Sequence, residues 1–88
     1  MSNMNEKYSQ IIVNRILGLC RQRGLNVHQL SVMSGVSHST LKNLVGRKTF
    51  NPRIKTLHRI ATAFNMTVAE FLDFEELNNF SFDDDEEE

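Results

Sequence analysis

The chain has 88 residues, enough for one domain with a single core and too few for a core plus an enclosed active-site cleft. Cys20 is the only cysteine, which excludes an internal disulfide and a cysteine-based zinc site and suits a reducing cytoplasm. The longest aliphatic run is three residues, Ile11 to Val13, so we expect neither a signal peptide nor a membrane span.

The net charge of −1 conceals a strong asymmetry along the chain. All ten Lys and Arg lie between Lys7 and Arg59, and Glu6 and Glu70 are the only acids before Asp73, so this body carries +8. From Asp73 onward there are nine acids and no base. A basic body with an acidic tail is typical of proteins with nucleic-acid partners, although charge also serves plain solubility.

The first predicted helix covers about residues 9–23. Its apolar residues recur at the i, i+4, i+7, i+8 spacing of a single helix face: Ile12, Ile16, Leu19 and Cys20. Gly24 follows two nearby arginines, which is a typical helix end because cations favour the negative end of the helix dipole. We therefore expect the apolar stripe to face the core.

Two short helices follow, each between a capping residue and a glycine. Asn26 can cap the second helix, which ends at Gly35 and has the apolar residues Val27, Leu30 and Met33. Ser37 can cap the third, which ends at Gly46 and has the apolar residues Leu41, Leu44 and Val45. Met33 is expected to fill the core, as is Met66 further along the chain.

A fourth helix is predicted to open at Pro52 and to end at Asn65 in a left-handed conformation. Its predicted buried face consists of Ile54, Leu57, Ile60, Ala61 and Phe64. Thr67 and Glu70 have the spacing of a capping box for a short fifth helix that carries Phe71 and Leu72. The sequence thus predicts an all-α fold, a compact domain of five helices.

Both ends are expected to be less ordered than the domain, residues 9–73. Residues 1–8 are predicted to be a flexible N-terminus and residues 74–88 an acidic, partly disordered tail, of which the six acids at 83–88 stay disordered. The mixed acids and aromatic residues of 74–82 could instead extend the fifth helix, seal a dimer interface or contact a protein partner.

The most informative stretch, residues 25–46, has the layout of a helix-turn-helix. The two helices are separated by the turn Ser34-Gly35-Val36, where Gly35 can take a positive φ and Val36 can fill the gap between the helices. Ser31 lies four residues before Gly35, and its small side chain allows the helices to approach closely. In this motif the second helix lies across a DNA backbone and the third is presented outward.

The outward face of the third helix is predicted to hold His38, Ser39, Lys42 and Asn43. Lys42 can donate to guanine, Asn43 can pair with adenine, and the other two can bond base edges or phosphate. An ordinary solvated helix face is the competing interpretation. The loop that follows favours DNA, because Arg47, Lys48, Arg53 and Lys55 form a cluster suited to phosphate, with Phe50 as a packing anchor.

Several runs resemble the Cro and lambda-repressor-like (XRE-type) helix-turn-helix family over about residues 10–73. The matching residues are Leu25-Asn26-Val27-His28-Gln29-Leu30-Ser31, Gly35-Val36-Ser37-His38-Ser39-Thr40-Leu41, Asn51-Pro52-Arg53-Ile54-Lys55-Thr56-Leu57, Ile60-Ala61, Phe64, Thr67 and Glu70-Phe71-Leu72. The resemblance implies base reading by the four third-helix residues already named. It implies phosphate contacts near the start of the second helix, by Asn26, Val27 and Gln29, and in the loop, by Lys48 and Arg53. The further candidates for phosphate contacts are Ser37, Thr40, Arg47 and Lys55.

The chain departs from that family in two places. Members usually carry a glycine one residue after Gly46, where this chain has Arg47. Some pair a buried arginine on the first helix with a glutamate on the third, at positions that correspond to Cys20 and Val45 here. An apolar pair can replace a buried ion pair without net loss, so the fold is not threatened.

Catalysis and cofactors are not expected. The three histidines lie on three different helices with no i, i+4 pair, no catalytic constellation has a supporting pocket, and Cys20 reads as a small core residue. Two functions therefore compete. The first is a sequence-specific DNA-binding regulator, a repressor that binds its operator as a homodimer. The second is an antitoxin or anti-repressor that uses the same scaffold and binds a protein partner through its acidic tail, which could also fold back and compete with DNA.

Overall fold

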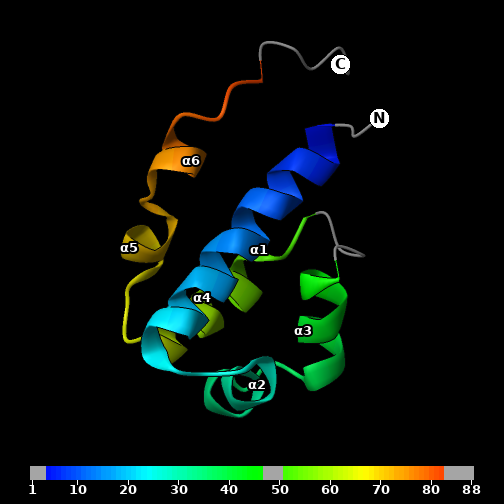
Figure 1. The fold of residues 1–88 in the computed structure, drawn as a ribbon, viewed down its shortest axis with the longest axis vertical. Coiled ribbons are helices and arrows are strands. Elements are labelled where there is room, and N and C mark those ends of the chain that lie inside the picture. Colours follow the sequence, from blue (N-terminus) through cyan, green and yellow to red (C-terminus); the bar gives the residue numbers. More distant parts are fainter. Residues whose placement is uncertain (1–3, 47–50, 83–88) are drawn as a thin grey trace.

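A computed structural model describes residues 4–46 and 51–82 of the chain. These residues form helices joined by short turns and contain no strand. The six helices, shown in Figure 1, are α1 (Met4–Arg23), α2 (Val27–Ser34), α3 (His38–Val45), α4 (Ile54–Ala63), α5 (Val68–Leu72) and α6 (Glu75–Asn78). The predicted all-α fold is confirmed, with one more helix than the five expected.

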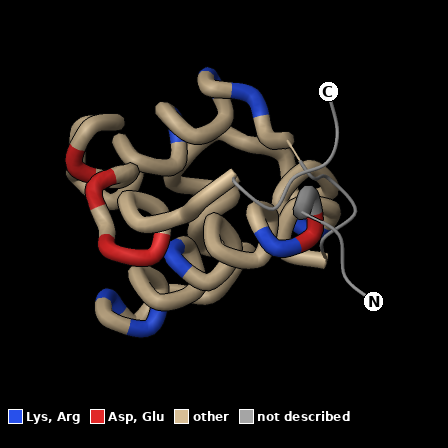
Figure 2. The backbone as a smooth tube through the Cα atoms, turned by 90° about the horizontal axis from the view of Figure 1, so that it is seen from above, with Lys and Arg blue, Asp and Glu red and all other residues tan. Residues whose placement is uncertain are grey.

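The described charges are unevenly distributed over this fold. Figure 2 shows the acids in two places, at the start of α1 and around α5 and α6, whereas basic residues occur over the rest of the body. The helix-turn-helix formed by α2 and α3 therefore carries no acid. None of the described helices combines the length and hydropathy needed to cross a membrane.

The core lies between α1 and the other helices. The predicted stripe of α1 is buried, as is Val13 beside it, and every helix from α2 to α5 contributes to the same cluster. The fully buried side chains from the later helices include Leu30, Leu41, Ile60, Phe64 and Phe71. Helix α2 packs on both α3 and α4, and α3 contributes Leu41 and Leu44 to the shared core.

Local signals in the sequence correctly predict most helix ends. Asn26 and Gln29 form a reciprocal capping box at the start of α2, and Thr67 and Glu70 form one at α5. Gly35 ends α2 with φ 74°, and Asn65 follows α4 with φ 62°. These residues end or cap the helices through local hydrogen bonds and backbone conformation, which involve only residues close in the sequence. The start of α4 is the exception, since it begins at Ile54 and not at Pro52.

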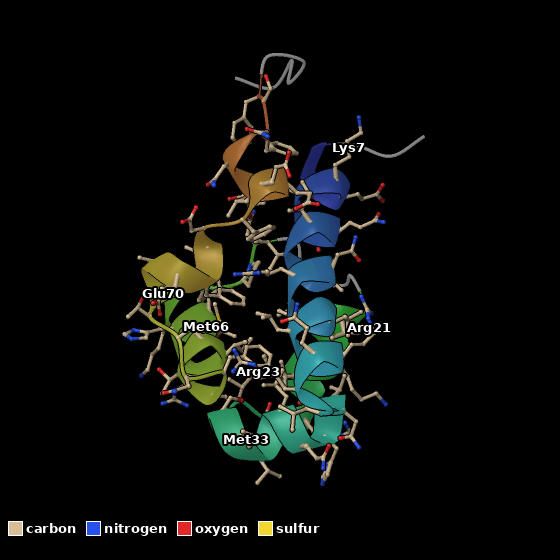
Figure 3. All side chains as sticks on the ribbon, turned by 60° about the vertical axis from the view of Figure 1, so that its left-hand side comes forward. Lys7, Arg21, Arg23, Met33, Met66 and Glu70 are labelled. Carbon is tan, nitrogen blue, oxygen red and sulfur yellow. The ribbon has the colours of Figure 1, made fainter. Side chains whose placement is uncertain are left out.

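Two predicted core residues lie at the surface. Met33 on α2 is 53% exposed and Ile54 on α4 is 64% exposed, whereas Met66 is half-buried against the core. Both exposed side chains belong to terminal turns of short helices, beyond Leu30 and Leu57, which fill the core. Figure 3 shows Met33 at the end of the molecule opposite Lys7. The periodicity of the sequence identifies the apolar face of a helix, but it does not show which residues of that face other elements cover.

The structure also differs from prediction at the two ends. Helix α1 begins at Met4, earlier than residue 9, and residues 74–82 follow a defined path that includes α6 along α1. Tyr8 contacts Phe80 and Phe82, with ring centroids 5.3 and 5.9 Å away. The expected disorder of residues 83–88 concerns a part of the chain outside the described residues.

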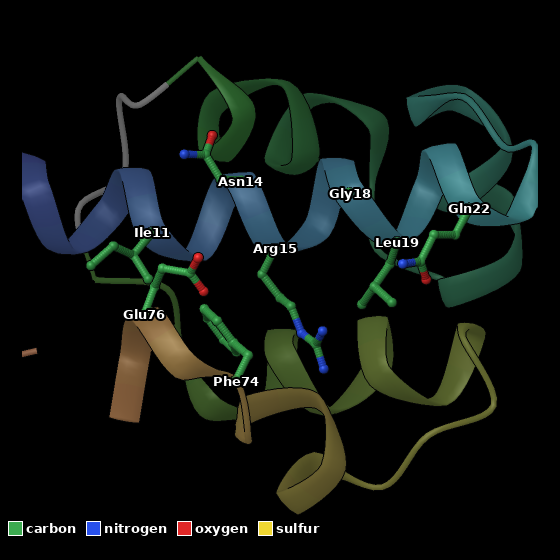
Figure 4. A pocket seen from close by; sticks show the side chains of 8 residues that line it. All are labelled: Ile11, Asn14, Arg15, Gly18, Leu19, Gln22, Phe74 and Glu76. Carbon is green, nitrogen blue, oxygen red and sulfur yellow. The ribbon is translucent and has the colours of Figure 1, made fainter. Parts of the chain in front are cut away.

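Arg15 joins α1 to the C-terminal helices. Its Nε donates to the carbonyl of Phe71 at 2.9 Å and its Nη2 to that of Glu70 at 3.1 Å, so it satisfies the end of α5. The guanidinium carbon also lies 4.9 Å from the ring centre of Phe74. In Figure 4, Arg15 and Phe74 border the cavity between α1 and the C-terminal segment.

Candidate nucleic-acid interface

The turn between α2 and α3 is fixed by contacts within the motif. The hydroxyl of Ser31 donates to the carbonyl of Val36 at 2.8 Å, and the amide of Gly35 donates to the carbonyl of Ser31 at 3.0 Å. Val36 is 6% exposed, which confirms that it fills the gap between the helices. From α4, Arg59 Nη1 donates to the carbonyl of Gly35 at 3.3 Å. The orientation of α3 relative to α2 is therefore fixed by contacts within the turn and by one contact from α4.

Helix α3 has one buried face and one outward face. Leu41 and Leu44 are fully buried and Val45 is half-buried. All four predicted base-reading residues are exposed on the same helix: His38, Ser39, Lys42 and Asn43. The structure thus brings these side chains together on a surface that offers a cation, an amide, a hydroxyl and an imidazole.

The hydroxyls at the start of α3 form a small network. Ser37 caps the helix, since its Oγ accepts from the Thr40 amide at 3.1 Å and donates to Thr40 Oγ1 at 2.8 Å. Ser39 Oγ lies 3.4 Å from Ser37 Oγ. The Thr40 hydroxyl can in turn donate a hydrogen bond to an acceptor outside the protein. Ser37 and Thr40, which are both predicted phosphate contacts, therefore lie together at the start of α3.

The start of α2 lies beside the start of α3. The rings of His28 and His38 meet edge to face, with centroids 5.4 Å apart. In the neighbouring capping box, Asn26 Oδ1 accepts from the Gln29 amide at 2.7 Å and Gln29 Oε1 accepts from the Asn26 amide at 2.9 Å, which leaves both side-chain NH₂ groups as donors. Val27 is half-buried in the core, so its backbone amide is the group that it can offer to a phosphate.

The start of α4 completes this surface. Arg53 is the N-cap residue of α4 and Lys55 lies in its first turn, both exposed. They border a concavity of about 250 Å³ together with Ser37 and Thr40. The structure therefore brings four of the predicted phosphate contacts into one hollow beside α3. Arg47 and Lys48, like the predicted packing anchor Phe50, belong to residues 47–50, outside the described part.

Several cations of the basic body also make contacts within the fold. Arg15 holds the end of α5, and Arg23 donates to the carbonyl of Phe64 and lies over its ring, at the end of α4. Arg59 holds the turn at Gly35. Lys42, by contrast, is exposed on α3 in a region whose sequence has no acid between Glu6 and Glu70. Arg53 and Lys55 add two exposed cations at the start of α4.

A comparison with protein families decides the identity of this arrangement. Residues 15–76 match the family model of the Cro/C1-type HTH DNA-binding domain. The chain belongs to this family. The match covers more than half of the chain and includes both helices of the motif, so the resemblance inferred from the sequence is confirmed. Neither the curated proteins nor the solved structures that were compared give a match.

Two features of this Cro/C1-type domain were beyond the reach of sequence reasoning. The contact between His28 and His38 joins two elements whose relative placement depends on the core, and no local pattern signals it. The internal roles of Arg15 and Arg23 are equally long-range, since each reaches a carbonyl more than 40 residues away. A cation near an apolar helix face is the available hint, because long side chains lay their stems on apolar surface.

Chemistry at the remaining polar groups of this domain is limited. Cys20 is buried, and burial raises the pKa of its thiol, which keeps it neutral and poorly reactive. At the positions of the occasional arginine–glutamate pair, Cys20 is buried and Val45 half-buried, which is consistent with an apolar replacement. No group of three potential metal ligands occurs among the described residues.

Proposed function

We propose that this Cro/C1-type domain binds a specific sequence of double-stranded DNA through α3 and acts as a transcriptional repressor. The observation that carries the proposal is the outward face of α3, where four exposed polar residues stand opposite the buried Leu41 and Leu44. A helix of this size fits the major groove, in which each base pair presents its own pattern of donors and acceptors.

In this proposal the four outward residues divide the reading of bases. Lys42 donates to guanine O6 and N7, and Asn43 pairs with adenine N6 and N7. Ser39 bonds a base edge. His38 lies where α3 meets α2 and bonds either a base or the adjoining phosphate.

Phosphate contacts flank α3 on both sides and set its register on the duplex. On one side are the amide groups of Asn26 and Gln29 and the backbone amide of Val27. On the other are Ser37, Thr40, Arg53 and Lys55 around the hollow described above, and Arg47 and Lys48 extend this set in sequence. Contacts with several phosphates predict binding that weakens steeply with salt.

We further propose that two copies bind one operator. A domain with one reading helix covers one half-site, and two half-sites about 34 Å apart on one face of the duplex double the contacts. Bound at a promoter, such a homodimer represses by excluding other proteins from the DNA. The cytoplasm is its proposed place of action, since a reducing compartment suits its single free cysteine.

The test is selection from a random library of duplex DNA, followed by binding at two salt concentrations. An enriched sequence motif and a steep salt dependence support the proposal. Lys42→Ala and Asn43→Ala should each cost about 1–3 kcal/mol on the selected site. Lys7→Ala removes an exposed cation at the far end of α1 and serves as the control. Absence of any enriched motif contradicts sequence-specific binding.

A second candidate function is that of an antitoxin or anti-repressor. The observation that favours it is Phe82, which is 58% exposed directly before the six acids of residues 83–88. In that case a basic protein partner binds the tail, and changes at Lys42 and Asn43 leave the activity intact. The same two variants therefore separate the two candidates.

A further inference from the structure

A second groove lies next to the hollow described above, between α2 and α4. It has a volume of about 330 Å³ and runs between the last turn of α2 and the outer face of α4. Its lining consists of Met33, Ser34, Lys55, His58, Arg59 and Thr62. The four α4 residues recur at i, i+3, i+4 and i+7, so they form the helix face opposite the buried Leu57, Ile60 and Ala61.

The groove combines an exposed apolar side chain with positive charge. Met33 is 53% exposed, although a large apolar side chain is normally placed in the core. Lys55 and Arg59 carry the charge, His58 adds a further nitrogen donor or acceptor, and Ser34 and Thr62 are neutral. With no acid between Glu6 and Glu70, the groove has no carboxylate of its own helices to neutralise it.

One segment of this chain has the complementary chemistry. Phe82 is 58% exposed and is followed by six consecutive acids at residues 83–88. An aromatic ring can pack on the polarisable sulfur of Met33 while the acids pair with Lys55 and Arg59. We propose that the groove binds residues 82–88 of a second copy of this chain.

A second copy is favoured over the same molecule by the position of the tail. Tyr8 holds Phe80 and Phe82 near the start of α1, and Figure 1 shows α2 and the end of the described chain at opposite ends of the longest axis. That axis measures 38 Å, whereas six extended residues span at most about 20 Å. While Tyr8 keeps its contacts, Phe82 of the same molecule therefore stays at the end opposite Met33 and cannot pack on it.

The contact has a defined symmetry. Tail and groove are different surfaces, so their pairing is heterologous and links molecules head to tail unless two copies exchange tails. It also shares Lys55 and Arg59 with the hollow beside Ser37 and Thr40. Occupation of the groove thus draws on cations that border the reading face.

The experiment uses the full-length chain and a fluorescently labelled peptide of residues 82–88, without DNA. Fluorescence anisotropy at low salt measures the affinity. Lys55→Glu should weaken binding by about tenfold, since it replaces attraction with repulsion in the groove. Lys42→Glu makes the same charge change on the outward face of α3 and should alter binding by less than about twofold. Circular dichroism verifies that both variants keep the helical fold.

Methyl NMR of the full-length chain supplies the second readout. Addition of the peptide should shift the methyl resonance of Met33 and leave that of Met66, which is packed against the core, in place. A peptide in which alanine replaces Phe82 should bind more weakly and shift Met33 less. Equal weakening by Lys55→Glu and Lys42→Glu, no binding at low salt, or an unmoved Met33 resonance would each overturn the proposal.

Discussion

Substitution by alanine should have opposite effects on the free energy of unfolding at two glycines, Gly35 and Gly18. Gly35 ends α2 at φ 74°, a conformation that costs a residue with a Cβ about 1–2 kcal/mol. A Cβ at Gly35 would meet only Arg59 Nη1, at 4.0 Å, so strain in the backbone is the whole cost. Gly18 lies inside α1, and a Cβ there would meet only Arg21 Nη2, at 3.8 Å, an ordinary contact.

The expected free energies follow from these geometries. Gly35→Ala should lower the free energy of unfolding by about 1–2 kcal/mol. Gly18→Ala should raise it by about 0.5–1 kcal/mol, because alanine loses less backbone entropy in a helix than glycine does. For a domain of this size, each 1 kcal/mol moves the melting temperature by about 4–8 °C. Asparagine tolerates the left-handed region, so the free energy of unfolding of Gly35→Asn should lie between those of wild type and Gly35→Ala.

The assay is urea unfolding followed by far-UV circular dichroism, with wild type and the three variants measured side by side. The m-values should agree, which indicates that the surface exposed on unfolding is unchanged. Equal effects of alanine at both positions would refute the reasoning, since they would mean that backbone conformation does not govern the turn. A stabilised Gly35→Ala variant would refute the geometry of the turn itself.

Three further predictions concern other parts of the chain. Arg15→Met removes two hydrogen bonds to carbonyls at the end of α5 and should lower the free energy of unfolding in urea by about 1–3 kcal/mol. Arg21→Met, at an exposed site, should change it by less than about 0.5 kcal/mol. Equal effects of the two variants would contradict the role of Arg15. Because burial raises the pKa of the Cys20 thiol, a thiol reagent at pH 8 should react far more slowly with the folded chain than with the urea-unfolded chain, and equal rates contradict its burial. Replacing the acids of residues 83–88 by their amides should tighten DNA binding at low salt, and the gain should grow with protein concentration if the tail acts on a second copy; a gain that is independent of concentration indicates competition within one molecule.

The sequence predicts those features that depend on neighbours a few residues away. Asn26, Thr67, Gly35 and Asn65 act through caps and backbone conformation, so their roles could be inferred before any tertiary contact was known. The outward face of α3 follows in the same way, because a buried leucine pair fixes which side of a short helix remains exposed.

The rest depends on where surfaces end and on contacts across the chain. Met33 and Ile54 have the right spacing for the core, yet each lies in a terminal turn of its helix and is exposed. The path of residues 74–82 depends on Arg15 and Tyr8, more than 60 residues from the aromatic rings that Tyr8 contacts, and no local pattern encodes such a pairing. Sequence reasoning could therefore list the options for this segment without choosing among them.

The central claim is that α3 reads base edges. Its most direct test is a measurement of base preference at every position of the selected DNA site, for wild type and for Lys42→Ala. The account predicts that the variant loses the preference for guanine at one position, a discrimination of about 1–3 kcal/mol, and keeps the other preferences. If Lys42→Ala binds more weakly to all sequences alike, with every base preference unchanged, then Lys42 contacts only the phosphate backbone and the claim is contradicted.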